Sequence, residues 1–460
     1  MPVLTELGKL GASLELTHAG MSAACEAIVD LVTAAAAAPP RDLTAALREA
    51  YGLGPSAIWF TDQTVAPAAA GFANARAAAA LDLDDGHRES RGHPGAAVIP
   101  AVLAVADLRA AAGDSPADAE ILRAVVVGYE IGIRIASARG FYARTGFWAG
   151  FAAAAGAGAL AGLDAGRLAH ALAIAGETGP HMATTTAPPA WPQPNGSDVK
   201  EGIPWGVASG LAAVPLARAG LTGPLDLVDH APFFDANAIL APRDRLAICD
   251  TYTKFQAACR HVHAPVEALV DVMRAHAIAA HEIDRIEVAA YSGALRIPNR
   301  PEPRNLVDAQ YSIPYCMSLA AHRGADALLP MTEAALHDRE VESLARRIAV
   351  MLDAGCEARF PGETPARVTI YARGRAFTSG MTTPRGEAAA RPSWDERVRK
   401  FSIATRHGLA PDDQARLLAA FAAVREGRLK PLRQALSSRS GEHPPAGTIK
   451  SRKSAEQDQL

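Results

Sequence analysis

Residues 81–95 read Leu81-Asp82-Leu83-Asp84-Asp85-Gly86-His87-Arg88-Glu89-Ser90-Arg91-Gly92-His93-Pro94-Gly95 and lie between two apolar stretches. This short segment holds four carboxylates, two histidines and two arginines. A loop of this composition, with its backbone fixed by glycine and proline, places acid/base groups beside guanidinium groups that bind carboxylates. A solvated connecting loop with an aspartate helix cap is the alternative. The composition leaves both explanations open, although binding and catalytic residues concentrate on loops.

The chain around this loop has helical patterning through most of its first half. Ser115-Pro116-Ala117-Asp118 has the features of a helix start, and residues 121–135 keep apolar side chains at helical spacing. Asp164 is expected to cap a helix over 165–175, and residues 199–219 continue the pattern up to a Gly-Pro breaker. A mainly α fold is therefore predicted.

The pattern of apolar and polar residues changes from about Tyr252 onward. Residues 283–288 and 366–371 nearly alternate apolar and polar side chains, which predicts half-exposed strands, and residues 376–378 could complete a hairpin. Helical patterning over 309–321 and 340–353 lies between these strands. This part of the chain is therefore expected to form a smaller α+β domain.

The predicted organisation has four parts. Residues 1–250 form the first part of a helical domain, and residues 251–388 form the α+β domain. Residues 389–436 return to the helical domain through helices over 394–404 and 411–426, and residues 437–460 are expected to be a disordered tail.

Composition and charge exclude several classes of protein. The 460 residues are 49% hydrophobic and carry a formal net charge of −3, so a packed interior is expected and a nucleic-acid partner is not. The most apolar stretches, 21–39 and 146–162, are interpreted as buried helices rather than membrane spans. The N-terminus lacks the pattern of a secretory signal, and the five cysteines include no CxxC pair. A soluble, cytoplasmic protein is the simplest expectation.

Several motifs resemble, in order, those of the MmgE/PrpD family, which includes 2-methylcitrate dehydratase, cis-aconitate decarboxylase and iminodisuccinate epimerase. The resemblance covers about residues 21–436, and the ordered set is specific where each single motif would be weak. The motifs are Asp82–His87, Gly92–Ala101, Gly128–Ile131, the Lys200 segment with Gly202 to Gly223, Lys254-Phe255 with Cys259-Arg260 and His263, Tyr311–Tyr315, and Pro392–Trp394.

The resemblance implies a large all-helical domain, an α+β lid domain and, usually, a homodimer. It implies an active site in the cleft between helical domain and lid, where closure excludes water around a reacting carbanion. It implies a small-molecule carboxylate substrate and no cofactor.

The resemblance also implies roles for individual residues. Asp82 and His93 match the acid/base pair of the first motif, Tyr315 matches a tyrosine from the lid, and His263 matches the histidine after the Cys-Arg pair. Lys200 matches a basic residue suited to holding a substrate carboxylate. Each residue also has a structural explanation, such as a helix cap, a hydrogen-bonded core side chain or a surface charge.

His87, Arg88, Arg91 and Arg260 are further candidates for contact with a carboxylate substrate. His261-Val262-His263 would suit a metal site if it formed a strand, because alternating histidines on a strand point the same way. No third and fourth ligand accompany them, the family works without metal, and the clustered cysteines of an iron–sulfur site are absent. No metal is therefore expected.

Two positions depart from the family pattern. Trp148 stands where decarboxylase and dehydratase members tend to have a histidine, and Trp191 lies in the segment where decarboxylases use a lysine. Both indoles are expected to make the pocket more apolar. These departures weaken the case for decarboxylation of cis-aconitate and caution against 2-methylcitrate, whose three carboxylates would require more cations.

The expected chemistry is removal of a proton next to a carboxylate. One of Asp82 and His93 acts as the base, the other or Tyr315 acts as the acid, and Lys200 with an arginine neutralises the developing charge. Loss of a hydroxyl makes a dehydratase, which is favoured by analogy, and return of the proton makes an epimerase or isomerase; a decarboxylase is also possible. A non-catalytic binding or scaffold protein and a metal-dependent hydrolase are the alternatives from other classes.

Overall fold

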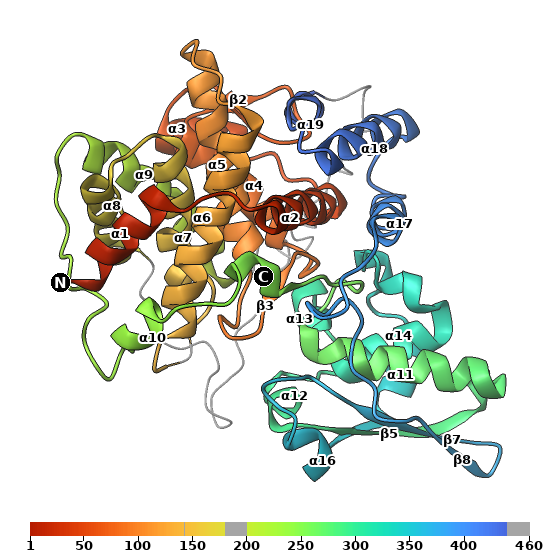
Figure 1. The fold of residues 1–460 in the computed structure, drawn as a ribbon. Helices are drawn as coiled ribbons and strands as arrows, with labels where there is room; N and C mark the ends of the chain where they lie inside the picture. The colour runs from red at the N-terminus through yellow and green to blue at the C-terminus, as the bar shows by residue number, and fades with distance from the viewer. Residues whose placement is uncertain (142, 180–199, 439–460) are drawn as a thin grey trace, which may run out of the picture.

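The computed structural model describes residues 1–141, 143–179 and 200–438 (Figure 1). Trp191 and the predicted tail beyond Ser438 lie outside these residues. The N-terminal part is almost entirely helical. Its helices are α1 (Val3–Ser13), α2 (His18–Ala37), α3 (Thr44–Tyr51), α4 (Pro67–Ala79), α5 (Pro94–Ala111), α6 (Asp118–Ser137), α7 (Gly146–Leu160), α8 (Ala165–Thr178), α9 (Ile203–Arg218) and α10 (Ala236–Leu240), with short 3-10 turns at Lys200–Gly202 and Ala247–Asp250.

Helix α7 is the centre of this helical part and contacts α5, α6, α8 and α9. It is built mainly from alanine and glycine, so neighbouring backbones come close. A Cβ on Gly210 of α9 would lie 2.5 Å from the carbonyl oxygen of Gly150 in α7, which only glycine avoids. The small residues of the sequence therefore set the close packing of these helices.

The middle of the chain forms an α+β unit around a four-stranded sheet with the order β6-β5-β7-β8. Strands β5 and β6 are parallel, whereas β5 with β7 and β7 with β8 are antiparallel. Helices α11 and α14 pack against each other over this sheet (Figure 1). The elements are α11 (Arg260–His276), β5 (Ile283–Ala290), α12 (Ser292–Arg296), α13 (Leu306–Gln310), α14 (Ile313–Arg323), α15 (Arg339–Ala345), β6 (Ile348–Leu352), α16 (Ala354–Glu357), β7 (Arg367–Ala372) and β8 (Arg375–Thr378), with 3-10 turns at Ala280–Glu282, Ala325–Leu328 and Glu333–Ala335.

The C-terminal helices α17 (Trp394–Ala404), α18 (Pro411–Arg425) and α19 (Lys430–Leu436) follow the sheet, and α17 and α18 contact α2. Lys400 of α17 is buried, and its Nζ donates to Asp30 Oδ1 at 2.6 Å and to the backbone oxygen of Leu83 at 3.0 Å. Leu83 lies in the loop between α4 and α5. Helix α17 therefore supports that loop through Lys400.

Two hydrophobic clusters organise the described residues. The first joins the N-terminal helices with residues from Phe401 to Leu436, and the second joins residues from Ala257 to Ala372. Leu81 and Leu83 belong to the second cluster although they precede α5 in sequence. The loop that carries Asp82 therefore lies where the two clusters meet. The predicted domain limits at 250/251 and 388/389 stay a prediction.

The mainly α class is confirmed, and several elements fall where the sequence predicted them. Asp164 caps α8 by accepting from the Arg167 backbone N–H at 2.8 Å, and the predicted hairpin is β7 with β8. The helix predicted from Ser115–Asp118 is α6, which begins at Asp118. Its N-cap is Ala117 rather than Ser115, and Glu120 accepts from the Ala117 N–H at 2.7 Å.

Two predicted helices are interrupted in the structure. The helix expected over 340–353 is wrong in its second half, because residues 348–352 form β6 and pair with β5. The helix expected over 309–321 divides at Tyr311 and Ser312, where the Ser312 side chain caps α14 by accepting from the Tyr315 N–H. Sheet pairing and capping in the folded chain outweigh the local helical pattern in these places.

Two helices, α2 and α5, are long and apolar enough to span a membrane by length and composition. The most apolar windows of these helices are 78% and 72% buried inside the protein, so both are packed as core helices.

Candidate active site

The site begins in the turn that leads from α4 into α5. Asp82 has a φ of +53°, in the left-handed region that side chains with a Cβ rarely adopt. The buried neighbours Leu81 and Leu83 hold this turn in place. Strained backbone of this kind is common at functional sites, where the surrounding packing maintains it.

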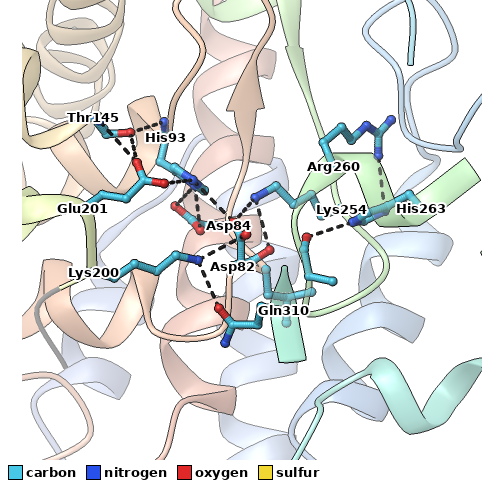
Figure 2. A network of polar contacts seen from close by, with 12 residues as sticks. Asp82, Asp84, His93, Thr145, Lys200, Glu201, Lys254, Arg260, His263 and Gln310 are labelled. Carbon is cyan, nitrogen blue, oxygen red and sulfur yellow. Dashed lines mark hydrogen bonds and ion pairs between the residues drawn. The ribbon is translucent and has the colours of Figure 1, made fainter. Parts of the chain in front are cut away.

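Asp82 binds two lysines that come from distant parts of the chain (Figure 2). Lys254 Nζ lies 2.6 Å from Asp82 Oδ1, and Lys200 Nζ lies 3.2 Å from Asp82 Oδ2. Burial alone would raise the pKa of the Asp82 carboxyl, but the two ammonium groups outweigh it and hold the pKa below its ordinary value. Asp82 is therefore an ionised anchor for two cations.

His93 lies beside this anchor at the first position before α5. Its Nδ1 is 3.1 Å from both carboxylate oxygens of Asp84. Its Nε2 is 3.4 Å from Asp82 Oδ1 and 3.8 Å from Glu201 Oε1. Burial acts to lower the pKa of His93, but the Asp84 charge outweighs it and the pKa is raised. The geometry is that of an imidazole oriented by a carboxylate, with its other nitrogen directed toward the centre of the cluster.

Glu201 and Thr145 close the opposite side of the cluster (Figure 2). Thr145 Oγ1 donates to Glu201 Oε2 at 2.8 Å and accepts from the His93 backbone N–H at 3.2 Å. Burial would raise the pKa of Glu201, but His93 and Lys200 lower it below its ordinary value. Glu201 is therefore a third carboxylate that stays ionised near neutral pH.

The α+β unit contributes two side chains from the end of α13. Gln310 Oε1 accepts from Lys200 Nζ at 3.2 Å, and the Tyr311 hydroxyl donates to Glu201 Oε1 at 3.2 Å. Lys200 Nζ also lies 5.4 Å from the centre of the Tyr311 ring. The cluster is thus completed across the boundary between the helical part and the α+β unit.

Asp85 stabilises the start of α5 through hydrogen bonds. Its Oδ1 accepts from the Gly95 N–H at 2.9 Å and its Oδ2 accepts from the Tyr129 hydroxyl at 2.8 Å. Burial, with the charges of Asp84 and Asp30, raises the pKa of Asp85 to about 7. These contacts fix the first turn of α5 and hence the position of His93.

Asp82, Asp84 and His93 offer ligand atoms within 4.8 Å of one another, which is a spacing that could hold a metal ion. Both oxygens of Asp82 already bind lysine ammonium groups. The donor set is thus arranged around two side-chain cations, which supply the positive charge that a metal would bring.

The structure brings three predicted site residues together and separates others from them. Asp82, His93 and Lys200 belong to one cluster. Tyr315 does not join it among the described residues: it is buried in the second hydrophobic cluster, and its hydroxyl donates to the backbone oxygen of Ala335. The predicted placement of Tyr315 in the cluster is therefore wrong, because its side chain packs inside the α+β unit.

Arg88 and Arg260 share one carboxylate, that of Glu387. Arg88 Nη2 donates to Glu387 Oε1 at 2.6 Å, and Arg260 Nη2 donates to the same oxygen. Both guanidinium groups lie near the ring of Tyr252, at 5.8 Å and 4.6 Å from its centre. In this structure they bind a protein carboxylate, so their predicted role in substrate binding stays untested.

The predicted histidines outside the cluster have structural partners. His87 Nδ1 accepts from the Ser90 N–H at 3.2 Å, and burial lowers the pKa of His87 to about 3. His263 is 3.1 Å from the Ala258 oxygen through Nε2 and 3.4 Å from Arg260 through Nδ1. His261 and His263 lie on helix α11 and not on a strand, so they are turned about 200° apart around the helix. The two histidines therefore do not have the strand geometry that a metal pair would need.

Trp148 is fully buried in α7, and its ring packs against Gly92, the residue before His93. A Cβ on Gly92 would lie 2.9 Å from Trp148 Cζ2 and 2.5 Å from Thr145 Oγ1. Trp148 therefore fixes the turn that carries His93. The other expected indole, Trp191, is outside the described residues.

Six cluster residues were not predicted: Asp84, Thr145, Glu201, Lys254, Gln310 and Tyr311. Three of them had a signal in the sequence. Asp84 lies in the acidic loop, Lys254 opens the Lys-Phe motif, and Tyr311 opens the motif that ends in Tyr315. The sequence gives no separate signal for Thr145, Glu201 or Gln310, because only the folded chain shows which side chains meet His93 and Lys200.

Comparisons with known proteins agree with the motifs. Residues 14–238 match the MmgE/PrpD N-terminal domain, and residues 257–426 match the MmgE/PrpD C-terminal domain. Over 76 residues the chain is 36% identical to cis-aconitate decarboxylase of Aspergillus terreus, in two curated sequences. That match covers 16% of this chain and 16% of the relative's length.

Proposed function

The chain belongs to the MmgE/PrpD family, and from this we propose that it is a lyase of the dehydratase type that abstracts a proton next to a carboxylate of a small hydroxy acid. The family includes 2-methylcitrate dehydratase and cis-aconitate decarboxylase. One observation carries the proposal: His93 is oriented by Asp84 and directs Nε2 toward a buried group of two lysines and two carboxylates.

His93 is the base in this proposal. When Nδ1 carries the proton and donates to Asp84, the neutral ring presents a lone pair at Nε2. The Asp84 carboxylate raises the pKa of His93, which makes the imidazole a better proton acceptor and stabilises the imidazolium that forms. The lowered pKa of Asp82 makes that residue a poor proton carrier, so its role is to hold Lys200 and Lys254.

The two lysines stabilise negative charge. Removal of a proton next to a carboxylate moves charge onto the carboxylate oxygens, and ammonium groups already in place lower the energy of that state. Both lysines are buried, which strengthens their effect because little water screens them. Each is held at Asp82 before substrate arrives, so little reorganisation is needed.

Tyr311 is the proposed acid, in place of Tyr315. Its hydroxyl donates to Glu201 Oε1, the same oxygen that lies 3.8 Å from His93 Nε2. In dehydration His93 takes the carbon-bound proton, the C–O bond breaks, Tyr311 protonates the leaving hydroxyl, and solvent returns the proton from His93 to Tyr311. The reach of Gln310 and Tyr311 to Lys200 and Glu201 supports a lid role for the α+β unit.

Epimerisation is the second candidate, and the observation that favours it is the shared contact at Glu201 Oε1. If the proton returned from Tyr311 to the opposite face of the carbanion, no group would leave and the carbon would be inverted. A purely binding protein would not need an oriented imidazole beside two buried lysines, so catalysis is favoured over a scaffold role.

Proton NMR in D₂O tests the proposal on metal-stripped protein with a panel of hydroxylated and unsaturated mono-, di- and tricarboxylates. We expect deuterium uptake next to a carboxylate with a new vinyl signal, whereas uptake with inversion alone would indicate an epimerase. His93→Ala should lower the rate by about 10²-fold or more while the circular dichroism spectrum stays unchanged. His407→Ala, at an exposed histidine, is the matched control. Unchanged turnover in His93→Ala would refute the assignment of the base.

A further inference from the structure

Glu201 is held in an unusual conformation at the edge of the cluster. Its φ is +54°, and the next residue, Gly202, is also left-handed at +71°. The side chain is fixed at both oxygens, by Thr145 at Oε2 and by Tyr311 at Oε1. This left-handed conformation strains the backbone of a residue with a Cβ by about 1 kcal/mol or more. The same conformation places the Glu201 carboxylate next to His93.

The charges of the cluster do not favour a substrate with several carboxylates. Among the described residues, the ion pairs of 4 Å or less join three carboxylates (Asp82, Asp84 and Glu201) to two ammonium groups and one imidazole. With His93 protonated the cluster is neutral, and with His93 neutral, as a base must be before it accepts a proton, the cluster carries one net negative charge. In neither state is a positive charge left over for a second carboxylate. Arg88 and Arg260 share the carboxylate of Glu387, so these three groups together carry one net positive charge.

We propose that Glu201 determines specificity by accepting a hydrogen bond from a neutral or cationic group of the substrate and repelling a second carboxylate. The substrate class is then a small monocarboxylate whose far end carries a hydroxyl, amide or amino group. The inference rests on the proposed function for the identity of the site, and it adds the chemistry of the second substrate group.

Each end of such a substrate has a partner. The single carboxylate would lie against Lys200 and Lys254, where the positive charge is concentrated. The far end would meet Glu201 Oε1, which already accepts a hydrogen bond from the Tyr311 hydroxyl. A carboxylate in that place would put two negative charges in contact within a buried site, where the repulsion is strong. An N–H or O–H group there gains a charge-assisted hydrogen bond instead.

The test compares binding of succinate with binding of its half-amide succinamate by isothermal titration calorimetry. The two probes have the same length and differ in charge at one end only, and neither carries a hydroxyl that could leave. We expect the protein to bind succinamate about tenfold or more tightly than succinate, and Glu201→Gln to remove this preference by strengthening succinate binding about tenfold. Glu333→Gln, at an exposed glutamate of the α+β unit, should leave the ratio unchanged.

Several results would overturn the inference: tighter binding of succinate by the unsubstituted protein, an unchanged ratio in Glu201→Gln, or no binding of either probe. If Glu201→Gln does not fold, the ratio for the unsubstituted protein still decides. Failure of the proposed function appears separately, as the absence of deuterium exchange across the panel. Exchange that is fastest on tricarboxylates would keep the proposed function and refute the role of Glu201.

Discussion

Replacement of Lys400 by methionine should destabilise the protein by about 3–5 kcal/mol, because it leaves Asp30 charged and buried without its cation. Lys400 and Asp30 expose 1% and 2% of their side chains, and the ion pair is 2.6 Å long. At that distance the Coulomb attraction is about 6 kcal/mol for an effective dielectric constant of about 20. The cost of removing both charges from water offsets much of this attraction, but Lys400→Met leaves the cost for Asp30 and removes the attraction.

The double variant Asp30→Leu/Lys400→Met separates the charge effect from packing. With neither charge present, only the hydrogen bond from Lys400 to the Leu83 oxygen is lost, at a cost of about 1–3 kcal/mol. The double variant should therefore be more stable than Lys400→Met alone by about 2 kcal/mol. Lys430→Met, at an exposed lysine of α19, should stay within about 0.5 kcal/mol of the unsubstituted protein.

The measurement is urea unfolding at pH 7.5 followed by circular dichroism, with all four proteins at one concentration. Loss of less than about 1 kcal/mol in Lys400→Met would refute the reasoning. A double variant no more stable than Lys400→Met would also refute it, because packing rather than the unpaired charge would then explain the loss.

Two further predictions concern the loop between α4 and α5. Asp84→Asn removes the carboxylate that raises the pKa of His93. Because His93 must be neutral to accept a proton, the acid limb of the rate–pH profile for exchange should move to lower pH. The maximal exchange rate should fall by about 10²-fold or more. A rate–pH profile that keeps its acid limb would show that Asp84 does not act on His93. Gly92→Ala adds a Cβ that would lie 2.5 Å from Thr145 Oγ1, so we expect a loss of about 1–3 kcal/mol in stability and slower exchange, and a thermal transition equal to that of the unsubstituted protein would contradict it.

The sequence was sufficient for elements whose pattern is local. Alternation predicts a strand over 283–288, and the structure has β5 over 283–290. The helix predicted over 394–404 occurs with those bounds and begins with a Ser-Trp-Asp-Glu cap. Strand β6 was missed because its residues fit a helical pattern equally well, and pairing with β5 decides between the two.

The site shows the same division between local and distant information. Asp82 and His93 lie in one recognisable loop, so the sequence could name both. Lys254 meets Asp82 across 172 residues, and Glu201 faces His93 only because its backbone turns left-handed. Tyr311 and Tyr315 belong to one motif, and only the break between α13 and α14 shows which of them reaches the cluster.

The contact of Lys400 with the Leu83 oxygen has a consequence for the time at which the site is complete during synthesis. The two residues are separated by 317 positions, which a ribosome takes roughly 15–60 s to translate. Until then the nascent loop lacks its support from α17. Asp82 also has neither of its lysine partners until Lys200 and Lys254 have been synthesised. The charges around His93 can therefore come together only after Lys254 has left the ribosome, and the loop gains its support from Lys400 later still. A product truncated before Lys200 would carry the acidic loop without its two lysines.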